Sequence, residues 1–215
     1  MEEFLTLKDH VYNYIADQIN RGNLLPGEKV NENSISEKLN ISRTPVREAL
    51  IQLSSEGLLE NVPRKGFVIK HLSVDEAKET YLIIGVLDGL AASLACDHLT
   101  EQNVKEMEYY IGSMDLAIDT GNYGMYYKLQ EEFHNVYLSV CPNKSLAQIL
   151  MQLKKKFLKK DYEPDSPDKI RQVLFATNEE HKEMLGLFRN KNSKELEEYM
   201  RNVHWDAQKA YMESL

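Results

Sequence analysis

Three histidines lie on or beside the apolar faces of segments with helical periodicity. His181 falls on the apolar stripe of one segment, and His134 and His204 border the stripes of two others. Since such faces point inward, the three imidazoles could converge. Clustered imidazoles suit zinc, nickel, copper or iron, and three protein ligands leave positions open for water or a carboxylate. The pattern is compatible with a divalent transition-metal site, but periodicity by itself favours three separate core histidines held by hydrogen bonds.

Positive side chains form a second group, between residues 43 and 66. Arg43, Thr44 and Arg47 gather at the N-terminal end of a predicted helix, where backbone N–H groups also favour phosphate. In helix-turn-helix proteins this end of the recognition helix meets base edges in the major groove. An arginine there can donate two hydrogen bonds to guanine, worth about 1–3 kcal/mol of discrimination. The group predicts DNA binding, and the alternative is ordinary solvated charge on a small domain.

Arg64 and Lys65 extend this group at a predicted hairpin turn. They stand beside Gly66, which lets the backbone approach a neighbour closely. A turn of this kind suits a wing that lies along the minor groove or a phosphate strand.

The elements that carry these cations are predicted from periodicity and from turn residues. A first helix begins at Leu7 and ends at Gly22, and a short helix over 34–39 is capped by Asn33. A third helix has Pro45 in its first turn and ends near Glu56. Two strands, at 58–62 and 67–70, flank the Pro63–Gly66 turn. Residues 1–72 are therefore expected to form a winged helix-turn-helix domain of three helices and a β-hairpin.

The rest of the chain has almost purely helical periodicity. We expect an all-α bundle over residues 73–215, so that the fold class is mainly α. Its six helices are predicted at 74–98, 101–119, 122–141, 145–160, 168–190 and 193–213.

Composition limits the compartment and the mode of nucleic-acid binding. Cys96 and Cys141 are too few and too far apart for a disulfide framework, and no stretch approaches the roughly 18 apolar residues that span a bilayer. We therefore expect a cytoplasmic protein without a membrane partner. The net charge is −8, with nine Lys/Arg and ten Asp/Glu in residues 1–70. Any DNA contact must come from a local cluster of cations.

The stretch from Leu25-Pro-Gly through Ser42-Arg-Thr-Pro-Val-Arg-Glu-Ala-Leu50 to Pro63-Arg-Lys-Gly66 resembles the DNA-binding domain of the GntR family of bacterial regulators. The resemblance covers nearly all of residues 5–70. It implies that Arg43, Thr44 and Arg47 contact operator bases and phosphates. It further implies that Lys65 and Gly66 sit on the wing and that Ser34 contacts a phosphate.

The helical part resembles the FCD effector-binding domain of the FadR subfamily, in the shorter, six-helix VanR-like form. The supporting residues are Phe133-His134, Asn143, Glu180-His181 and His204. The metal-binding FCD pattern usually has Asp-x-x-x-His, and here Gln130 occupies the Asp position. The resemblance implies zinc or nickel on the three histidines, with Gln130 as a weaker ligand, or else a converted, metal-free pocket. The implied effector-binding residues are Gln130, His134, Tyr137, Asn178, His181 and His204.

The leading functional hypothesis is a transcriptional regulator, a repressor, that binds a palindromic double-stranded DNA operator as a homodimer. Two half-sites are expected because one recognition helix reads only a few base pairs. The implied effector is a small carboxylate, such as an organic or sugar acid, or a fatty acyl compound if the pocket holds no metal. A metal-dependent hydrolase or lyase is a competing class, but no motif places a Glu or Asp base near the histidines, so we expect no enzyme. A winged helix that binds only proteins is the third class.

Overall fold

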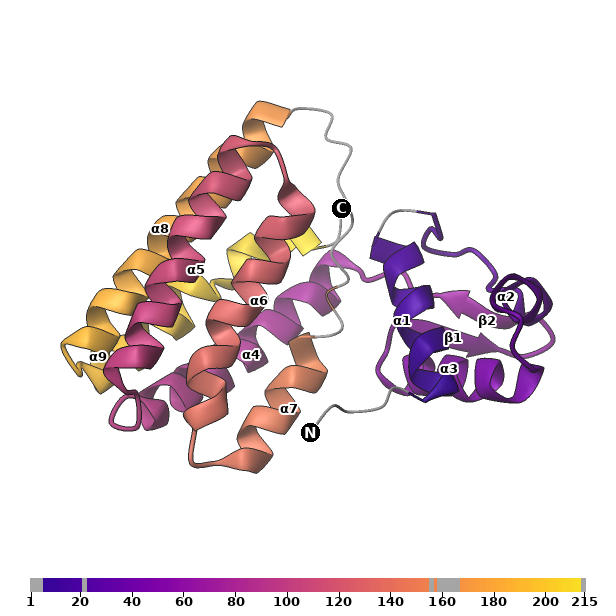
Figure 1. Cartoon of the computed structure of the whole chain (residues 1–215), viewed down its shortest axis with the longest axis horizontal. Helices are drawn as coiled ribbons and strands as arrows, with labels where there is room; N and C mark the ends of the chain where they lie inside the picture. The colour runs from indigo at the N-terminus through magenta and orange to yellow at the C-terminus, as the bar shows by residue number, and fades with distance from the viewer. Residues whose placement is uncertain (1–5, 21–22, 155–156, 158–166, 214–215) are drawn as a thin grey trace. The chain divides into compact units, whose positions relative to one another are not determined.

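The computed structural model describes residues 6–20, 23–154, 157 and 167–213 of the 215-residue chain. The chain divides into two compact units (Figure 1). The N-terminal unit runs up to Ser73, and the C-terminal unit includes Val74–Lys154 and the described residues from Pro167 on. Each unit is described by itself.

The N-terminal unit has three helices followed by a β-hairpin, as the sequence predicts. The elements are α1 (Leu7–Asn20), α2 (Glu32–Leu39), α3 (Arg43–Ser55), β1 (Leu59–Val62) and β2 (Gly66–Ile69). Helix α3 packs against α1, α2 and β1 and is the centre of the unit. Its buried residues are Val46, Ala49, Leu50 and Leu53, at the i, i+3, i+4, i+7 spacing of one apolar face. The predicted end of the first helix at Gly22 lies outside the described residues.

Helix α2 begins earlier than the sequence suggested, because its cap is Asn31 and not Asn33. The Asn31 side-chain oxygen accepts hydrogen bonds from the backbone N–H groups of Asn33 and Ser34, at 3.0 and 3.2 Å. These two N–H groups belong to the first turn, which has no intrahelical acceptor for them. The helix ends at Leu39, and the capping residue Asn40 lies in the left-handed region at φ 52°, which asparagine tolerates better than most residues.

The hairpin receives a third extended segment that the sequence analysis missed. Strands β1 and β2 pair antiparallel from Leu59 opposite Ile69 to Val62 opposite Gly66. On the other edge of β2, the Val30 N–H donates to the Phe67 carbonyl at 2.9 Å, and the Ile69 N–H donates to Glu28 at 2.9 Å. The segment around Lys29 therefore closes one edge of the hairpin, which stiffens the predicted wing at its base.

The C-terminal unit is all-helical, as predicted. Its α-helices are α4 (Val74–Ala95), α5 (Glu101–Asp119), α6 (Tyr123–Val140), α7 (Lys144–Lys154), α8 (Pro167–Arg189) and α9 (Ser193–Tyr199). Helix α5 packs against α6 and α8, and α4 packs against α6, α7 and α9 (Figure 1). The predicted extension of the fourth helix to residue 160 falls, apart from residue 157, outside the described residues. Within the described part of the chain, no helix is long and apolar enough to cross a membrane.

The single helix predicted for 193–213 is wrong, because the chain breaks there. Helix α9 passes into a π-helical turn, Met200–His204, and a 3-10 helix, Ala207–Glu213, follows. At the break, His204 and Trp205 are both buried, with 6% and 8% of their surfaces exposed. Neighbouring residues of a regular α-helix project about 100° apart. The π turn and the break allow two successive side chains to enter the same core.

Two glycines of α4 let the broken segment approach closely. A Cβ atom at Gly89 would lie 2.8 Å from the Glu197 carbonyl oxygen, and one at Gly85 would lie 3.3 Å from that of Arg201. Any larger residue would push α9 and the π turn away from α4. The glycines therefore fix the distance between α4 and the segment that carries His204.

Candidate metal centre and nucleic-acid interface

The structure brings the three predicted histidines together inside the C-terminal unit. His134 comes from α6, His181 from α8 and His204 from the π turn. All three are buried, with 4%, 0% and 6% of their surfaces exposed. One ring nitrogen of each lies within 4.8 Å of those of the other two. These three histidines are called the histidine centre below.

Each imidazole of the histidine centre has an acceptor at its Nδ1 atom. His134 Nδ1 lies 2.8 Å from the Tyr137 hydroxyl oxygen. His181 Nδ1 lies 3.3 Å from the Asn178 side-chain oxygen, and His204 Nδ1 lies 3.0 Å from a Glu180 carboxylate oxygen. In metal sites, such partners hold the ring in place and leave the other nitrogen free to bind the ion.

The three groups next to the Nδ1 atoms are themselves held by neighbouring residues. The Asn178 amide donates to the Ile111 carbonyl at 3.1 Å and to Asp115 at 2.8 Å, which leaves its oxygen as an acceptor for His181. The other Glu180 oxygen is paired with Lys209. Burial, followed by the charge of Asp88, raises the pKa of Tyr137 well above its usual value, so its hydroxyl keeps its proton. The arrangement fixes all three rings.

The spacing of the ring nitrogens fits a tetrahedral metal ion. His134 Nε2 and His204 Nε2 lie 3.3 Å apart. Two nitrogens bound to zinc at about 2.0–2.1 Å and at a tetrahedral angle are about 3.3–3.4 Å apart. Two imidazole lone pairs at this separation would repel each other unless a proton or a cation lay between them. Three imidazoles also leave a fourth position for water or a carboxylate oxygen.

Of the other predicted effector residues, the structure places Tyr137 and Asn178 in contact with this centre. Gln130 lies one helical turn before His134 and is half-buried. The polar atoms of Tyr137 and Asn178 are hydrogen-bonded to His134 and His181, so an effector would have to compete for them.

Sequence reasoning did not predict that two carboxylates contact the histidines. It named Glu180 only as part of the Glu180-His181 motif and did not name Asp88. In the structure a Glu180 oxygen lies 3.0 Å from His204 Nδ1, and Asp88 of α4 lies 3.7 Å from His134 Nδ1. One signal was available for Asp88, which is the only charged residue between Tyr81 and Ala95 in an otherwise apolar helix. A lone charge on such a helix is a candidate for a buried, functional position.

The predicted DNA-contacting residues of α3 are on the surface of the N-terminal unit. Arg43, Thr44 and Arg47 are all exposed, on the side of α3 opposite its buried face. The side chain of Ser42, which precedes the helix, makes no capping hydrogen bond. The first-turn N–H groups of α3 are thus available beside two guanidinium groups, an arrangement that suits a phosphate.

The remaining predicted contacts lie on α2 and at the hairpin tip. Ser34 is exposed in the first turn of α2. Arg64 and Lys65 are exposed between β1 and β2, and Arg64 and Gly66 have φ angles of 65° and 89°. The left-handed conformation at both residues makes the tip a tight turn that projects its cations outward.

Family comparisons agree with both units. Residues 7–69 match the gntR family of bacterial regulatory proteins, and residues 79–204 match the FCD domain. The chain is 31% identical over 140 residues to the uncharacterized HTH-type transcriptional regulator YdhC of Bacillus subtilis, covering 65% of this chain and 62% of that protein. It is 31% identical over 128 residues to the Nta operon transcriptional regulator of Aminobacter aminovorans, covering 60% of each chain. The matches thus span about 60% of the length of these curated relatives.

Solved structures share the fold over nearly the whole chain. Escherichia coli McbR/YncC superposes with a TM-score of 0.79 at 23% identity, covering 97% of this chain and 100% of that one. A putative transcriptional regulator GntR from Rhodococcus sp. RHA1 superposes with a TM-score of 0.74 at 14% identity, covering 95% and 97%. At these identities the likeness concerns the fold alone. The two family matches, which together account for both units, establish that this chain belongs to the gntR family of regulatory proteins and carries a C-terminal FCD domain.

Proposed function

We propose that this protein is a transcriptional repressor that binds a palindromic operator as a homodimer and responds to a small carboxylate held by a metal ion in its FCD domain. The observation that carries the proposal is the convergence of three buried imidazoles, each with its Nδ1 atom on an acceptor. The family and the exposed cations of α3 support the DNA-binding part.

DNA binding is assigned to α3 and the hairpin tip. Arg43, Thr44 and Arg47 would meet base edges and phosphates, and Arg64 and Lys65 would follow the neighbouring groove or strand. Relatives named as transcriptional regulators support the same role. Because the chain as a whole is acidic, these local cations are expected to carry the salt dependence of binding.

Metal binding is assigned to the histidine centre. His134, His181 and His204 would hold zinc or nickel, with the Gln130 amide oxygen as a weaker additional ligand. When bound, the ion would supply a Lewis-acidic site with an open position for a carboxylate oxygen of the effector. The surrounding protein excludes water, since the three histidines are buried.

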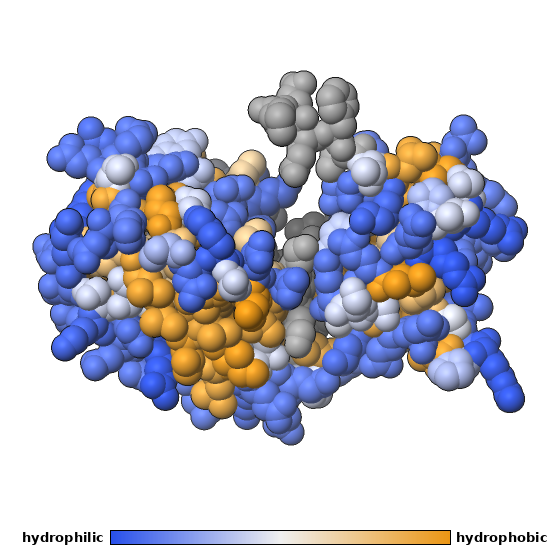
Figure 2. Space-filling model, turned by 90° about the horizontal axis from the view of Figure 1, so that it is seen from below, coloured by the Kyte–Doolittle hydropathy of each residue, from blue (hydrophilic) through white to orange (hydrophobic). Residues whose placement is uncertain are grey.

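Dimerisation is assigned to the outer face of α4. Figure 2 shows a broad apolar area on the C-terminal unit. The exposed apolar residues of α4 are Leu82, Ile83, Val86, Leu90 and Leu94, each 38% to 60% exposed. Their spacing, largely of four residues, gathers them on one side of the helix. A second copy is the expected partner, because a palindromic operator requires two recognition helices related by a two-fold axis.

A metal-dependent hydrolase is the second candidate, because two carboxylates lie beside the histidines. Both are engaged, however. Glu180 accepts from His204 and pairs with Lys209. Asp88 accepts one hydrogen bond at each oxygen and forms an ion pair with Lys154. Neither is free to take a proton from a metal-bound water, so we infer a binding role for the centre.

Two measurements test the proposal. An operator selected from random duplexes should bind the wild type, and Arg47→Ala should lose most of that affinity and lower its salt dependence. Lys128→Ala removes an equal charge from an exposed position of α6 and should change neither the affinity nor its salt dependence. Elemental analysis of protein purified without chelator should find about one zinc or nickel per chain, absent from His134→Ala. DNA binding unaffected by Arg47→Ala would disprove the assignment of α3, and a metal-free wild type would disprove that of the histidine centre.

A further inference from the structure

Asp88 is a completely buried carboxylate with polar partners from three parts of the C-terminal unit. Its Oδ1 atom accepts the Tyr137 hydroxyl of α6 at 2.7 Å. Its Oδ2 atom accepts the Trp205 indole N–H at 2.9 Å and pairs with the Lys154 ammonium at 2.7 Å. Burying a carboxylate is costly unless it is paired and hydrogen-bonded, so Asp88 requires all of these partners.

The hydrogen bond to Asp88 determines where the proton of the Tyr137 hydroxyl points. A hydroxyl has one proton, and a carboxylate can only accept, so the Tyr137 O–H is directed at Asp88. The Tyr137 oxygen is then an acceptor for its other neighbour, His134 Nδ1, at 2.8 Å. His134 must therefore carry its proton on Nδ1, which leaves the Nε2 lone pair facing His204.

We propose that Asp88 and Tyr137 are positioning residues that fix His134 in its Nδ1–H tautomer and so make Nε2 a metal ligand. The inference deepens the proposed metal-binding function and rests on it for its biological use. The tautomer itself is a property of the metal-free protein. His181 and His204 need no second residue behind the acceptor to orient it, because an amide oxygen and a carboxylate can only accept from their Nδ1 atoms.

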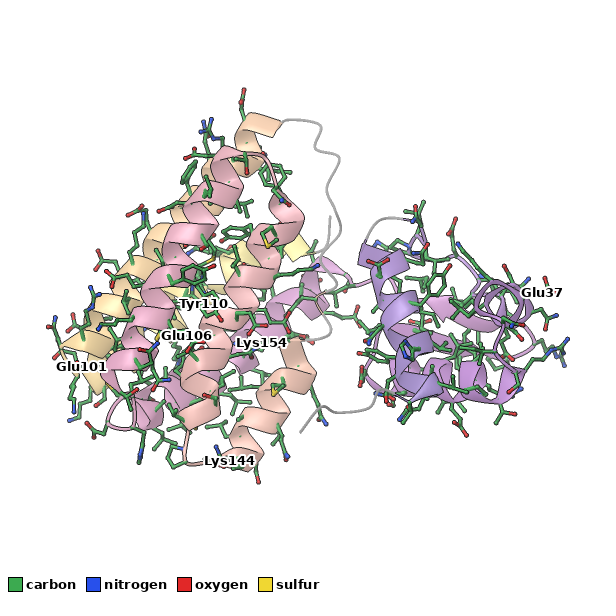
Figure 3. The ribbon with its side chains drawn as sticks, in the orientation of Figure 1. Glu37, Glu101, Glu106, Tyr110, Lys144 and Lys154 are labelled. Atoms are coloured by element: carbon green, nitrogen blue, oxygen red, sulfur yellow. The ribbon has the colours of Figure 1, made fainter. Side chains whose placement is uncertain are left out.

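Lys154 is the third partner of Asp88. Figure 3 labels this residue at the C-terminal end of α7. Its ammonium pairs with Asp88, and it also lies 5.2 Å from the centre of the Trp205 ring. The side chain is 21% exposed, so its charge is partly shielded from water. The ammonium thus faces the same carboxylate that accepts the Tyr137 O–H, so Lys154 and Tyr137 share Asp88 as their partner.

The first test is the tautomer of His134, read from imidazole ¹⁵N shifts of chelator-treated protein by NMR. The wild type should show a protonated Nδ1 at His134. Tyr137→Phe removes the acceptor, so His134 should become a mixture of tautomers while His181 keeps its own. Tyr126→Phe is the matched control, because this tyrosine is also on α6 and fully buried, and its hydroxyl has no hydrogen-bond partner among the described residues. The control should leave His134 unchanged.

The second readout is zinc affinity, measured by competition with a chelating dye. Loss of an outer partner of a metal-bound histidine typically weakens binding by about 10–100-fold, which is the expectation for Tyr137→Phe against Tyr126→Phe. Asp88→Asn keeps the shape of the side chain and removes its charge, so it should shift the His134 tautomer in the same direction. This variant replaces Tyr137→Phe if the latter does not fold.

The outcomes separate the two proposals. An unchanged His134 tautomer in both Tyr137→Phe and Asp88→Asn would overturn the positioning role, even if the wild type binds zinc. A fixed Nδ1–H tautomer that is lost in Tyr137→Phe, in a protein that binds no zinc, would support the positioning role and refute the proposed metal function.

Discussion

The Nε2 atoms of His134 and His204 lie 3.3 Å apart, although 70 positions separate the two residues in the chain. One comes from the middle of α6 and the other from the π turn after α9. Their meeting depends on the close approach of α4 to α9, since α4 packs against both α6 and the broken segment. The histidine centre is thus a product of the packing of the whole C-terminal unit.

Metal binding should stabilise the C-terminal unit. An ion that binds only the folded state raises the free energy of unfolding by about 2.7 kcal/mol at a free concentration of 100 times its Kd. We therefore expect zinc to raise the thermal midpoint of the wild type and to leave that of His181→Ala unchanged. Differential scanning calorimetry would measure both. His98→Ala, in an exposed position outside the centre, should respond like the wild type.

Gln130→Asp should bind zinc more tightly than the wild type. The residue lies one turn before His134, and a carboxylate is a stronger ligand for a divalent ion than an amide oxygen. The increase would be measured by competition with a chelating dye. Gln130→Ala sets the baseline, since it removes the side-chain ligand altogether. Equal affinity in all three proteins would mean that position 130 does not reach the metal.

Gly89→Ala should destabilise the protein by about 1–3 kcal/mol, because overpacking forces neighbouring backbone apart. The new Cβ atom would lie 2.8 Å from the Glu197 carbonyl oxygen. Gly112→Ala is the matched control on α5, where a Cβ atom meets nothing within 4 Å. That change should stabilise the helix by about 0.5–1 kcal/mol. Urea unfolding should show a lower free energy of unfolding for Gly89→Ala and a higher one for Gly112→Ala, each relative to the wild type. Changes of the same sign would contradict the close approach of α4 and α9.

Leu82→Glu should convert the expected dimer into monomers. Leu82 is 60% exposed among the other apolar residues of α4, and a charge there would be buried at the interface without a partner. Light scattering after gel filtration would report the mass. Leu116→Glu on α5, where Leu116 is 65% exposed, should leave the mass unchanged. A dimer that survives Leu82→Glu would exclude this face of α4 as the interface.

Local sequence determined most of the elements and their inward faces. Residues such as Val46 and Leu50 recur at helical spacing, and a helix that buries this face must expose Arg43 and Arg47. The same periodicity turned the three histidines inward. These features depend on side chains a few positions apart, so they can be predicted without knowledge of the fold.

Tertiary packing alone decided how these faces combine. The pairing of the segment around Lys29 with β2 joins distant parts of the chain and leaves no local signature. The break after His204 replaces a continuous helix because Trp205 finds an acceptor on Asp88 and space beside Gly85. Asp88 itself is far in sequence from the histidine it orients. The sequence therefore determined which residues are buried, and only the close packing of α4, α6, α8 and the π turn decided that three of them form one centre, because contacts between distant segments depend on the complete fold.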